Sequence, residues 1–103
     1  MADALAQAYV ALGVLRLHNL RTLTRLGRGE EPGPESSWVK LAWTNMTQGL
    51  SEAALLVTGR DASSAESGPW SRQWLWSKAA SIAGGTSQVQ RDIIAGRILG
   101  LPR

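Results

Sequence analysis

The chain has 103 residues, of which 44% are hydrophobic and 18% are charged, a composition typical of a single soluble globular domain. It contains no cysteine, which excludes a disulfide framework and a thiolate metal site. Eleven Lys and Arg residues against eight Asp and Glu give a net charge of only +3, and the basic residues are scattered, so charge does not indicate a nucleic-acid-binding protein.

The N-terminal segment shows no sign of export or membrane insertion. Asp3 comes early, and no basic leader precedes an apolar block, as it does in a signal peptide. The uncharged apolar runs fall far below the ~20 residues that cross a bilayer. We therefore expect a cytoplasmic protein with neither a membrane nor a nucleic acid among its partners.

The first predicted element is a helix from Asp3 to Leu26. Apolar residues recur in it near the helical period and cover so much of its circumference that we expect neighbours on more than one side. Gly27 is expected to end it, in a Gly- and Pro-rich break over residues 27–34. His18, the only histidine, has no metal-ligating partner at suitable spacing and is interpreted as a packing or surface residue. Four basic residues are interpreted as a solvated edge: Arg16, Arg21, Arg25 and Arg28.

A second helix is predicted from about Ser37 to Thr58. Its apolar residues fall at spacings of three and four, which is typical of an amphipathic helix, and Gly59 ends it. Residues 59–69 form the second and longest break. We expect Leu50 to be central to the core, together with Ile94 of the last helix, because both stand on apolar stripes.

A shorter third helix is predicted from Trp70 to Ala80, and it holds three of the five tryptophans. One interpretation is a platform on which nucleic-acid bases stack. Packing in the core or at an interface is the favoured alternative, because tryptophan side chains bury large areas. The residues concerned are Trp70, Trp74 and Trp76, with Arg72 and Lys78 beside them.

The last predicted helix begins near Thr86. Gly84 and Gly85 before it permit positive φ angles and the close approach of a ligand, and the side chain of Thr86 or Ser87 can cap the helix. Ser87 and Gln90 stand at the spacing of a capping box. The N–H groups of such a helix start converge on one spot and suit an anion, although the plain interpretation is a helix start after a turn.

Four helical segments, short connections and no strand-like alternation predict an all-α fold, arranged as an up-and-down bundle of about four helices. No Ser-His-Asp set, phosphate-binding loop, dinucleotide fingerprint or paired-carboxylate site stands in the sequence. We expect no metal site. The residue patterns alone therefore indicate a fold and leave the reaction open.

The run from Gly84 to Arg103, Gly-Gly-Thr-Ser-Gln-Val-Gln-Arg-Asp-Ile-Ile-Ala-Gly-Arg-Ile-Leu-Gly-Leu-Pro-Arg, resembles the C-terminal end of an acyl-CoA dehydrogenase. Three upstream stretches, Asn19–Arg21, Pro32–Glu35 and Lys40–Trp43, are similar to the bacterial branch of that family. The resemblance covers nearly the whole chain. It implies that residues 1–103 form one partial C-terminal helical domain, and we expect the family's N-terminal and middle domains to be absent.

The resemblance implies an FAD-dependent oxidoreductase of fatty acid metabolism, a flavoprotein that introduces an α,β double bond into acyl-CoA thioesters. In such an enzyme FAD carries the redox step, and the protein supplies position and proton transfer. By the same resemblance, Gly85 meets the substrate through its backbone. Thr86, Ser87 and Gln88 match residues that line the FAD. Gly84 stands where many members have a glutamate base, so we expect no catalytic residue from this loop.

Two hypotheses follow. In the first, the chain is the C-terminal portion of an acyl-CoA dehydrogenase, inactive alone, that contributes FAD-binding and oligomerisation surface in an assembly of like or different chains. In the second, it is a non-catalytic helical assembly module that pairs through its tryptophans and apolar faces. The sequence leaves open the acyl substrate, the electron acceptor, the oligomeric state and the origin of the base, from an earlier helix or a second subunit. It also leaves open whether the chain is a fragment, a truncated gene product or a true subunit.

Overall fold

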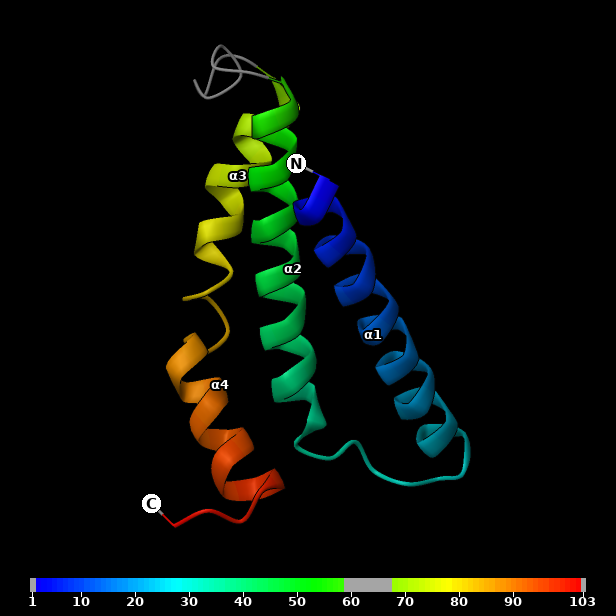
Figure 1. Cartoon of the computed structure of the whole chain (residues 1–103). Helices are drawn as coiled ribbons and strands as arrows, with labels where there is room; N and C mark the ends of the chain where they lie inside the picture. Colours follow the sequence, from blue (N-terminus) through cyan, green and yellow to red (C-terminus); the bar gives the residue numbers. More distant parts are fainter. Residues whose placement is uncertain (1, 59–67, 103) are drawn as a thin grey trace.

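In the computed structural model, which describes residues 2–58 and 68–102, these residues form helices and no strand (Figure 1). The elements are α1 (Ala2–Gly27), α2 (Glu35–Thr58), α3 (Pro69–Ala79), α4 (Ser87–Ile93) and a π-helix, η2 (Ile94–Ile98), that directly follows α4. The all-α prediction is confirmed, and every predicted helix is present with ends shifted by one or two residues. Most of the predicted second break, residues 59–67, lies outside the described residues. No helix of the described part is long and apolar enough to cross a membrane.

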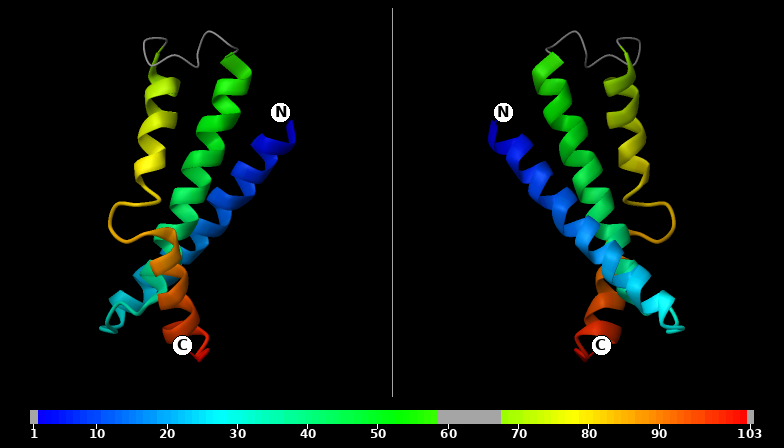
Figure 2. Two further views of the ribbon diagram at one scale, coloured as in Figure 1. Left: turned by 90° about the vertical axis from the view of Figure 1, so that its left-hand side faces the viewer. Right: turned by 90° about the vertical axis from the view of Figure 1, so that its right-hand side faces the viewer.

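Helix α2 is the centre of the molecule. Helix α1 runs antiparallel to it on one side, while α3 and α4 follow one another along the other side, both antiparallel to α2 (Figures 1 and 2). Among the described residues, α1 makes no close backbone approach to α3 or α4, whereas α2 approaches all three. The helices therefore form three columns, because the connection between α3 and α4 bends the chain without reversing its direction.

Side chains near the α1–α2 connection hold these two helices together. Arg25 donates to Glu30 at 2.7 Å and to Glu35 at 2.6 Å, and these hydrogen bonds raise the pKa of Arg25. The pKa of Glu35 is lowered, chiefly by a hydrogen bond from its own backbone N–H and further by Arg25. Arg25 thus lies at the surface, as expected for a solvated edge, but it is ion-paired to Glu30 and Glu35. His18 is half-buried with its ring 4.2 Å from that of Trp38, which confirms its packing role.

Helices α2 and α3 pack through small polar residues. Thr44, Ser51, Ser71 and Ser77 are almost fully buried. Three of their hydroxyls donate to carbonyls of their own helix at 2.6–2.8 Å, so they need no partner across the interface. Across it, Gln48 donates from Nε2 to the carbonyl of Ser77 at 2.9 Å. Small side chains let the two helices approach closely with little apolar burial.

An ion pair links the outer edges of the same two helices. Lys78 of α3 donates to Glu52 of α2 at 2.6 Å, which lowers the pKa of Glu52. The Lys78 Nζ atom also lies 5.0 Å from the centre of the Trp74 ring. Trp74 is half-buried, so it has the predicted packing role, whereas Trp70 and Trp76 are exposed. Neither of these two belongs to the core of the described chain, since Trp70 is 44% and Trp76 75% exposed.

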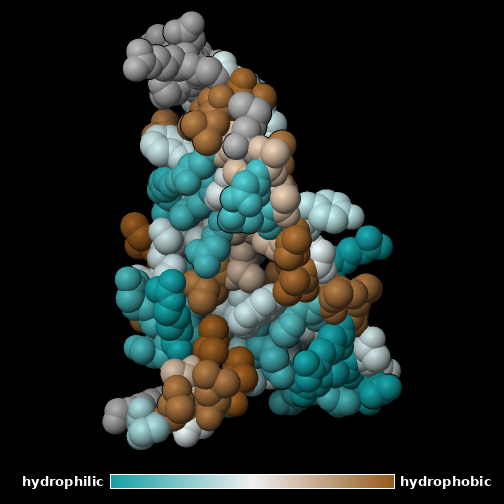
Figure 3. Space-filling view, viewed as in Figure 1, coloured by the Kyte–Doolittle hydropathy of each residue, from teal (hydrophilic) through white to brown (hydrophobic). Residues whose placement is uncertain are grey.

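Most large apolar side chains lie on the surface. Among the described residues, Leu15 and Ala53 are the only buried apolar residues. Leu50, predicted to be central, is 39% exposed, and Ile94 is only partly buried, so the predicted core is wrong for Leu50. Figure 3 shows apolar residues at the surface over several helices. The radius of gyration is 16.2 Å, against about 13 Å for a compact chain of this size.

Candidate functional site

The candidate site is the connection between α3 and α4, residues 80–86, which lies beside the first half of α2. The backbone N–H of Ala83 donates to the carbonyl of Ala79 at 2.8 Å and extends the last turn of α3. Gly84 and Gly85 then take φ angles of 66° and 97°. Residues with a Cβ atom are strained in this conformation, so the two glycines permit the bend that the sequence predicted at this point.

Thr86 caps the helix that follows. Its Oγ1 atom accepts from the backbone N–H of Val89 at 3.2 Å, which confirms the capping prediction for Thr86. The predicted capping box is wrong, because Ser87 is the first residue inside the helix and Gln90 bonds elsewhere. The Gln90 Nε2 atom turns back and donates to the carbonyl of Gly84 at 3.1 Å. The N–H of Ser87 donates to Ser81 at 3.1 Å and closes the loop.

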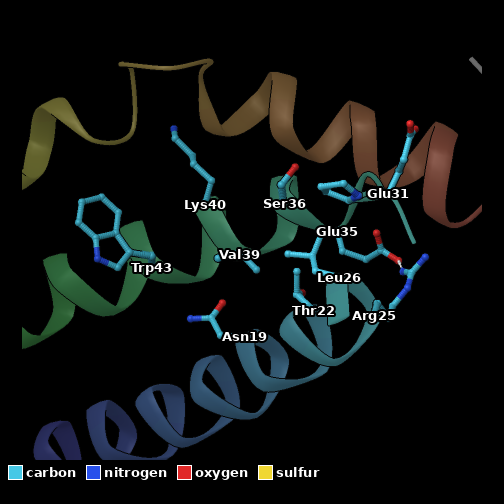
Figure 4. A pocket seen from close by; sticks show the side chains of 12 residues that line it. Asn19, Thr22, Arg25, Leu26, Glu31, Glu35, Ser36, Val39, Lys40 and Trp43 are labelled. Atoms are coloured by element: carbon cyan, nitrogen blue, oxygen red, sulfur yellow. Dashed lines mark hydrogen bonds and ion pairs between the residues drawn. The ribbon is translucent and has the colours of Figure 1, made fainter. Parts of the chain in front are cut away.

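Lys40 of α2 reaches the same loop. Its Nζ atom donates to the carbonyl of Gly85 at 2.6 Å, and Figure 4 shows its side chain extending from α2 toward the segment between α3 and α4. The helical periodicity of the sequence did not predict this contact, since Lys40 is not among the apolar residues that define it. No local sequence pattern marks this contact, because Lys40 and Gly85 are 45 positions apart.

The two glycines differ in the space around them. A Cβ atom on Gly85 would lie 2.6 Å from Nε2 of Gln90, so only glycine fits there without a rearrangement. A Cβ atom on Gly84 would meet nothing within 4 Å. No acidic side chain belongs to the loop, and no group of acidic or histidine side chains in the described residues could hold a metal ion. The loop therefore holds no carboxylate base.

The start of α4 offers donors that the described residues do not use. The backbone N–H groups of Gly85 and Thr86 have no partner there, and the side chains of Ser87 and Gln88 make no hydrogen bond within the described chain. Unused donors at an accessible loop suit a ligand with carbonyl, hydroxyl or phosphate oxygens. This donor chemistry fits FAD, the cofactor that the resemblance implies.

A cavity of about 360 Å³ lies between α1 and α2 and is lined largely by apolar surface (Figure 4). Trp43 and Lys40 line it from α2, and Leu26 lines it from α1. Arg25 and Glu35 also line it, joined by their ion pair. Lys40 belongs to both sites, because it lines this cavity and its ammonium group bonds the loop.

Comparison with known proteins gives a consistent result. Residues 1–99 match the family described as acyl-CoA dehydrogenase, C-terminal domain. A protein named acyl-CoA dehydrogenase IpdE1, from Mycolicibacterium smegmatis, is 38% identical over 98% of this chain and 25% of its own length. A protein of the same name from Mycobacterium tuberculosis is 35% identical over 98% of this chain and 26% of its own length. The chain thus spans about a quarter of the length of the curated relatives it matches.

Proposed function

Because the chain belongs to the acyl-CoA dehydrogenase family, we propose that it forms the C-terminal helical part of an FAD-dependent enzyme that introduces an α,β double bond into acyl-CoA thioesters. The observation that carries this proposal is the loop before α4, where two left-handed glycines precede donors that the described chain leaves unused. In this proposal residues 1–103 are one partial domain, and the other domains belong to a longer protein or a second chain. The chain is then cytoplasmic and inactive by itself.

The proposed roles within the loop are those of binding and orientation. Thr86, Ser87 and Gln88 contact FAD, and Gly85 contacts the thioester end of the substrate through its backbone. When bound, FAD supplies the acceptor for the hydride that leaves the β-carbon. Gly84 has no side chain that could remove the α-proton, so the base comes from an earlier helix or from a second subunit.

Replacing Gln88 with alanine should weaken flavin binding in the assembled complex. Loss of one hydrogen bond corresponds to about 0.5–1.5 kcal/mol. Gln88 is exposed and bonds to no other described residue, so the change leaves the fold intact. The measurement is the flavin absorbance that remains with the protein after gel filtration. Gln7→Ala is a matched control, because Gln7 is an exposed glutamine on α1 that bonds only to the nearby Asp3 among the described residues.

Thr86 needs a different design, because its hydroxyl also caps α4. Thr86→Val removes both the proposed cofactor contact and the cap, and loss of a cap costs about 0.5–2 kcal/mol of helix stability. Thr86→Ser keeps a hydroxyl that can cap and is therefore the control for this site. Unchanged flavin retention in both Gln88→Ala and Thr86→Val would contradict the proposed cofactor contacts.

The proposal also includes association with like or different chains of the same family. Many large apolar residues are exposed to solvent, and apolar patches of this kind usually mark surfaces that bind another protein. We expect the purified chain to be oligomeric or prone to aggregation at micromolar concentration, as measured by light scattering. A monodisperse monomer that binds no hydrophobic dye would contradict this expectation.

One observation favours the second candidate function, a non-catalytic assembly module. Trp43, Trp70 and Trp76 are exposed along α2 and α3, and exposed tryptophans are typical of interfaces. One measurement distinguishes the two functions. It is the flavin absorbance of the purified chain, alone and together with the product of the neighbouring upstream reading frame. Stoichiometric flavin in the joint preparation supports the enzyme, and association without flavin supports the assembly module.

A further inference from the structure

The two glycines of the loop are each held by a side chain from a different helix. Lys40 of α2 donates to the carbonyl of Gly85 at 2.6 Å, and Gln90 of α4 donates to the carbonyl of Gly84 at 3.1 Å. Gln90 is among the few buried residues of the chain, and Lys40 is partly buried. Two successive carbonyls of the Gly84–Gly85 dipeptide are thus each bonded by a side chain from a different helix.

Fixing a carbonyl also fixes the next N–H group. The peptide unit is planar and trans, so its carbonyl and its N–H point in opposite directions. The bond from Gln90 to Gly84 therefore orients the N–H of Gly85, and the bond from Lys40 to Gly85 orients the N–H of Thr86. Neither of these two N–H groups has a hydrogen-bond partner among the described residues.

Without these two bonds the peptide units that follow Gly84 and Gly85 lose their side-chain restraints. Glycine populates positive and negative φ angles about equally, so the peptide units of Gly84 and Gly85 can rotate at little cost. A hydrogen bond to a charged donor is roughly twice as strong as a neutral one, which makes Lys40 the stronger of the two restraints. The Gln90 amide also lies 2.6 Å from where a Cβ atom of residue 85 would stand, so a side chain at that position would displace it.

We propose that Lys40 and Gln90 are positioning residues that set the direction of the Gly85 and Thr86 N–H groups toward a ligand. The identity of the ligand, an acyl-CoA thioester beside a flavin, rests on the proposed function. It concerns neither proton transfer nor redox chemistry. Lys40 and Gln90 act through the loop backbone, and only the loop donors meet the ligand.

The test is hydrogen–deuterium exchange of the full chain, followed across residues 81–90. In Lys40→Met, which keeps the length of the side chain and removes the donor, exchange of this segment should accelerate roughly ten- to a hundredfold, the range for a lost hydrogen bond to a charged group. Exchange in α1 should stay unchanged. Lys40→Arg restores a donor and should restore protection, which a purely space-filling role for Lys40 does not require.

Lys78→Met is the matched control. The Lys78 side chain also bonds across two elements, to Glu52 of α2, but it bonds to no residue of the loop, and the Lys78 carbonyl that accepts from Ser81 is kept in the variant. If Lys40→Met unfolds the chain, Gln90→Met tests the same restraint at Gly84 with Lys40 in place. Unchanged exchange of residues 81–90 in the folded variants, or equal acceleration in Lys78→Met, would overturn the inference.

A second readout separates this inference from the proposed function. In the assembled complex, Lys40→Met should lower flavin retention and Lys78→Met should not. If the wild-type complex holds no flavin while the exchange results are as expected, the proposed function fails and the restraint on the loop stands. If flavin is retained equally in wild type and Lys40→Met, the link between loop restraint and ligand is overturned.

Discussion

A glutamate at position 84 should accelerate flavin bleaching by acyl-CoA about 10²–10⁴-fold in a complex that has no other base for this site. This range is typical of a positioned general base. The loop contains no acidic side chain, and position 84 is where the resemblance places a glutamate in many members of the family. A Cβ atom on Gly84 meets no neighbour within 4 Å, so the first atom of the new side chain has room.

The backbone of Gly84 sets the cost of this substitution. Its φ angle of 66° is left-handed, and a residue with a Cβ atom in that region is strained by about 1–2 kcal/mol. Gly84→Gln carries the same strain and nearly the same shape without a carboxylate, so it is the matched control. If Gly84→Glu bleaches the flavin faster and Gly84→Gln does not, the gain comes from proton removal and not from a changed loop conformation.

The measurement is anaerobic bleaching of the flavin after acyl-CoA is added, in an assembly whose other active sites have been inactivated. Slow or absent bleaching is expected with Gly84 in place. Fast bleaching with Gly84 would show that an earlier helix or a second subunit already supplies the base to this site. In that case Gly84→Glu should bring little gain, because another base already removes the proton at this site.

The helices of this fold could be predicted from sequence because their signals are local. Apolar periodicity defines α1 and α2, and the glycine and proline residues after α1 end it near the predicted residue. The cap at Thr86 follows from its own chemistry and the positions of Gly84 and Gly85. Each of these features depends on residues a few positions apart.

The contacts that define the candidate site are not local. Lys40 and Gly85 are 45 positions apart, and no periodicity records which lysine reaches which carbonyl. The switch to a π-helix at Ile94 was also not predicted, and there the Leu99 N–H donates to the carbonyl of Ile94 at 3.0 Å. This end of the helix lies against α2. Periodicity in the sequence does not show where a helix changes from α to π geometry.

The prediction of a buried Leu50 was wrong, because the burial of an apolar helix face depends on which other elements cover it. Helical spacing places Leu50 on an apolar face of α2, but that face is only partly covered in the described chain, and the side chain is 39% exposed. Thr44, Ser51 and Ser77 are buried instead, because their hydroxyls are satisfied within their own helices and their small size suits close packing. Ranking residues by hydrophobicity does not identify such positions.

Leu15→Ala should therefore be the most destabilising leucine truncation in this chain, with a loss of roughly 2–5 kcal/mol in the free energy of unfolding. Leu15 is the one large apolar residue that is buried among the described residues, and α1 closely approaches α2 alone. Its removal leaves a cavity where α1 is attached. Leu50→Ala removes the same atoms from a partly exposed position and should cost about 1 kcal/mol or less.

The comparison requires denaturant unfolding of both variants at one protein concentration, because association shifts apparent stability. Leu17→Ala is the control, since Leu17 lies two positions from Leu15 on α1 and is 69% exposed. It carries the same change in helix propensity without a cavity. If burial in the isolated chain sets the cost, Leu15→Ala should lose the most free energy of unfolding. Leu50→Ala should then lose less than Leu15→Ala, and at least as much as Leu17→Ala. If Leu50→Ala costs as much as Leu15→Ala, then Leu50 is covered in solution by a second molecule. The cost of that variant should then fall as the protein is diluted, since only a bimolecular contact depends on concentration.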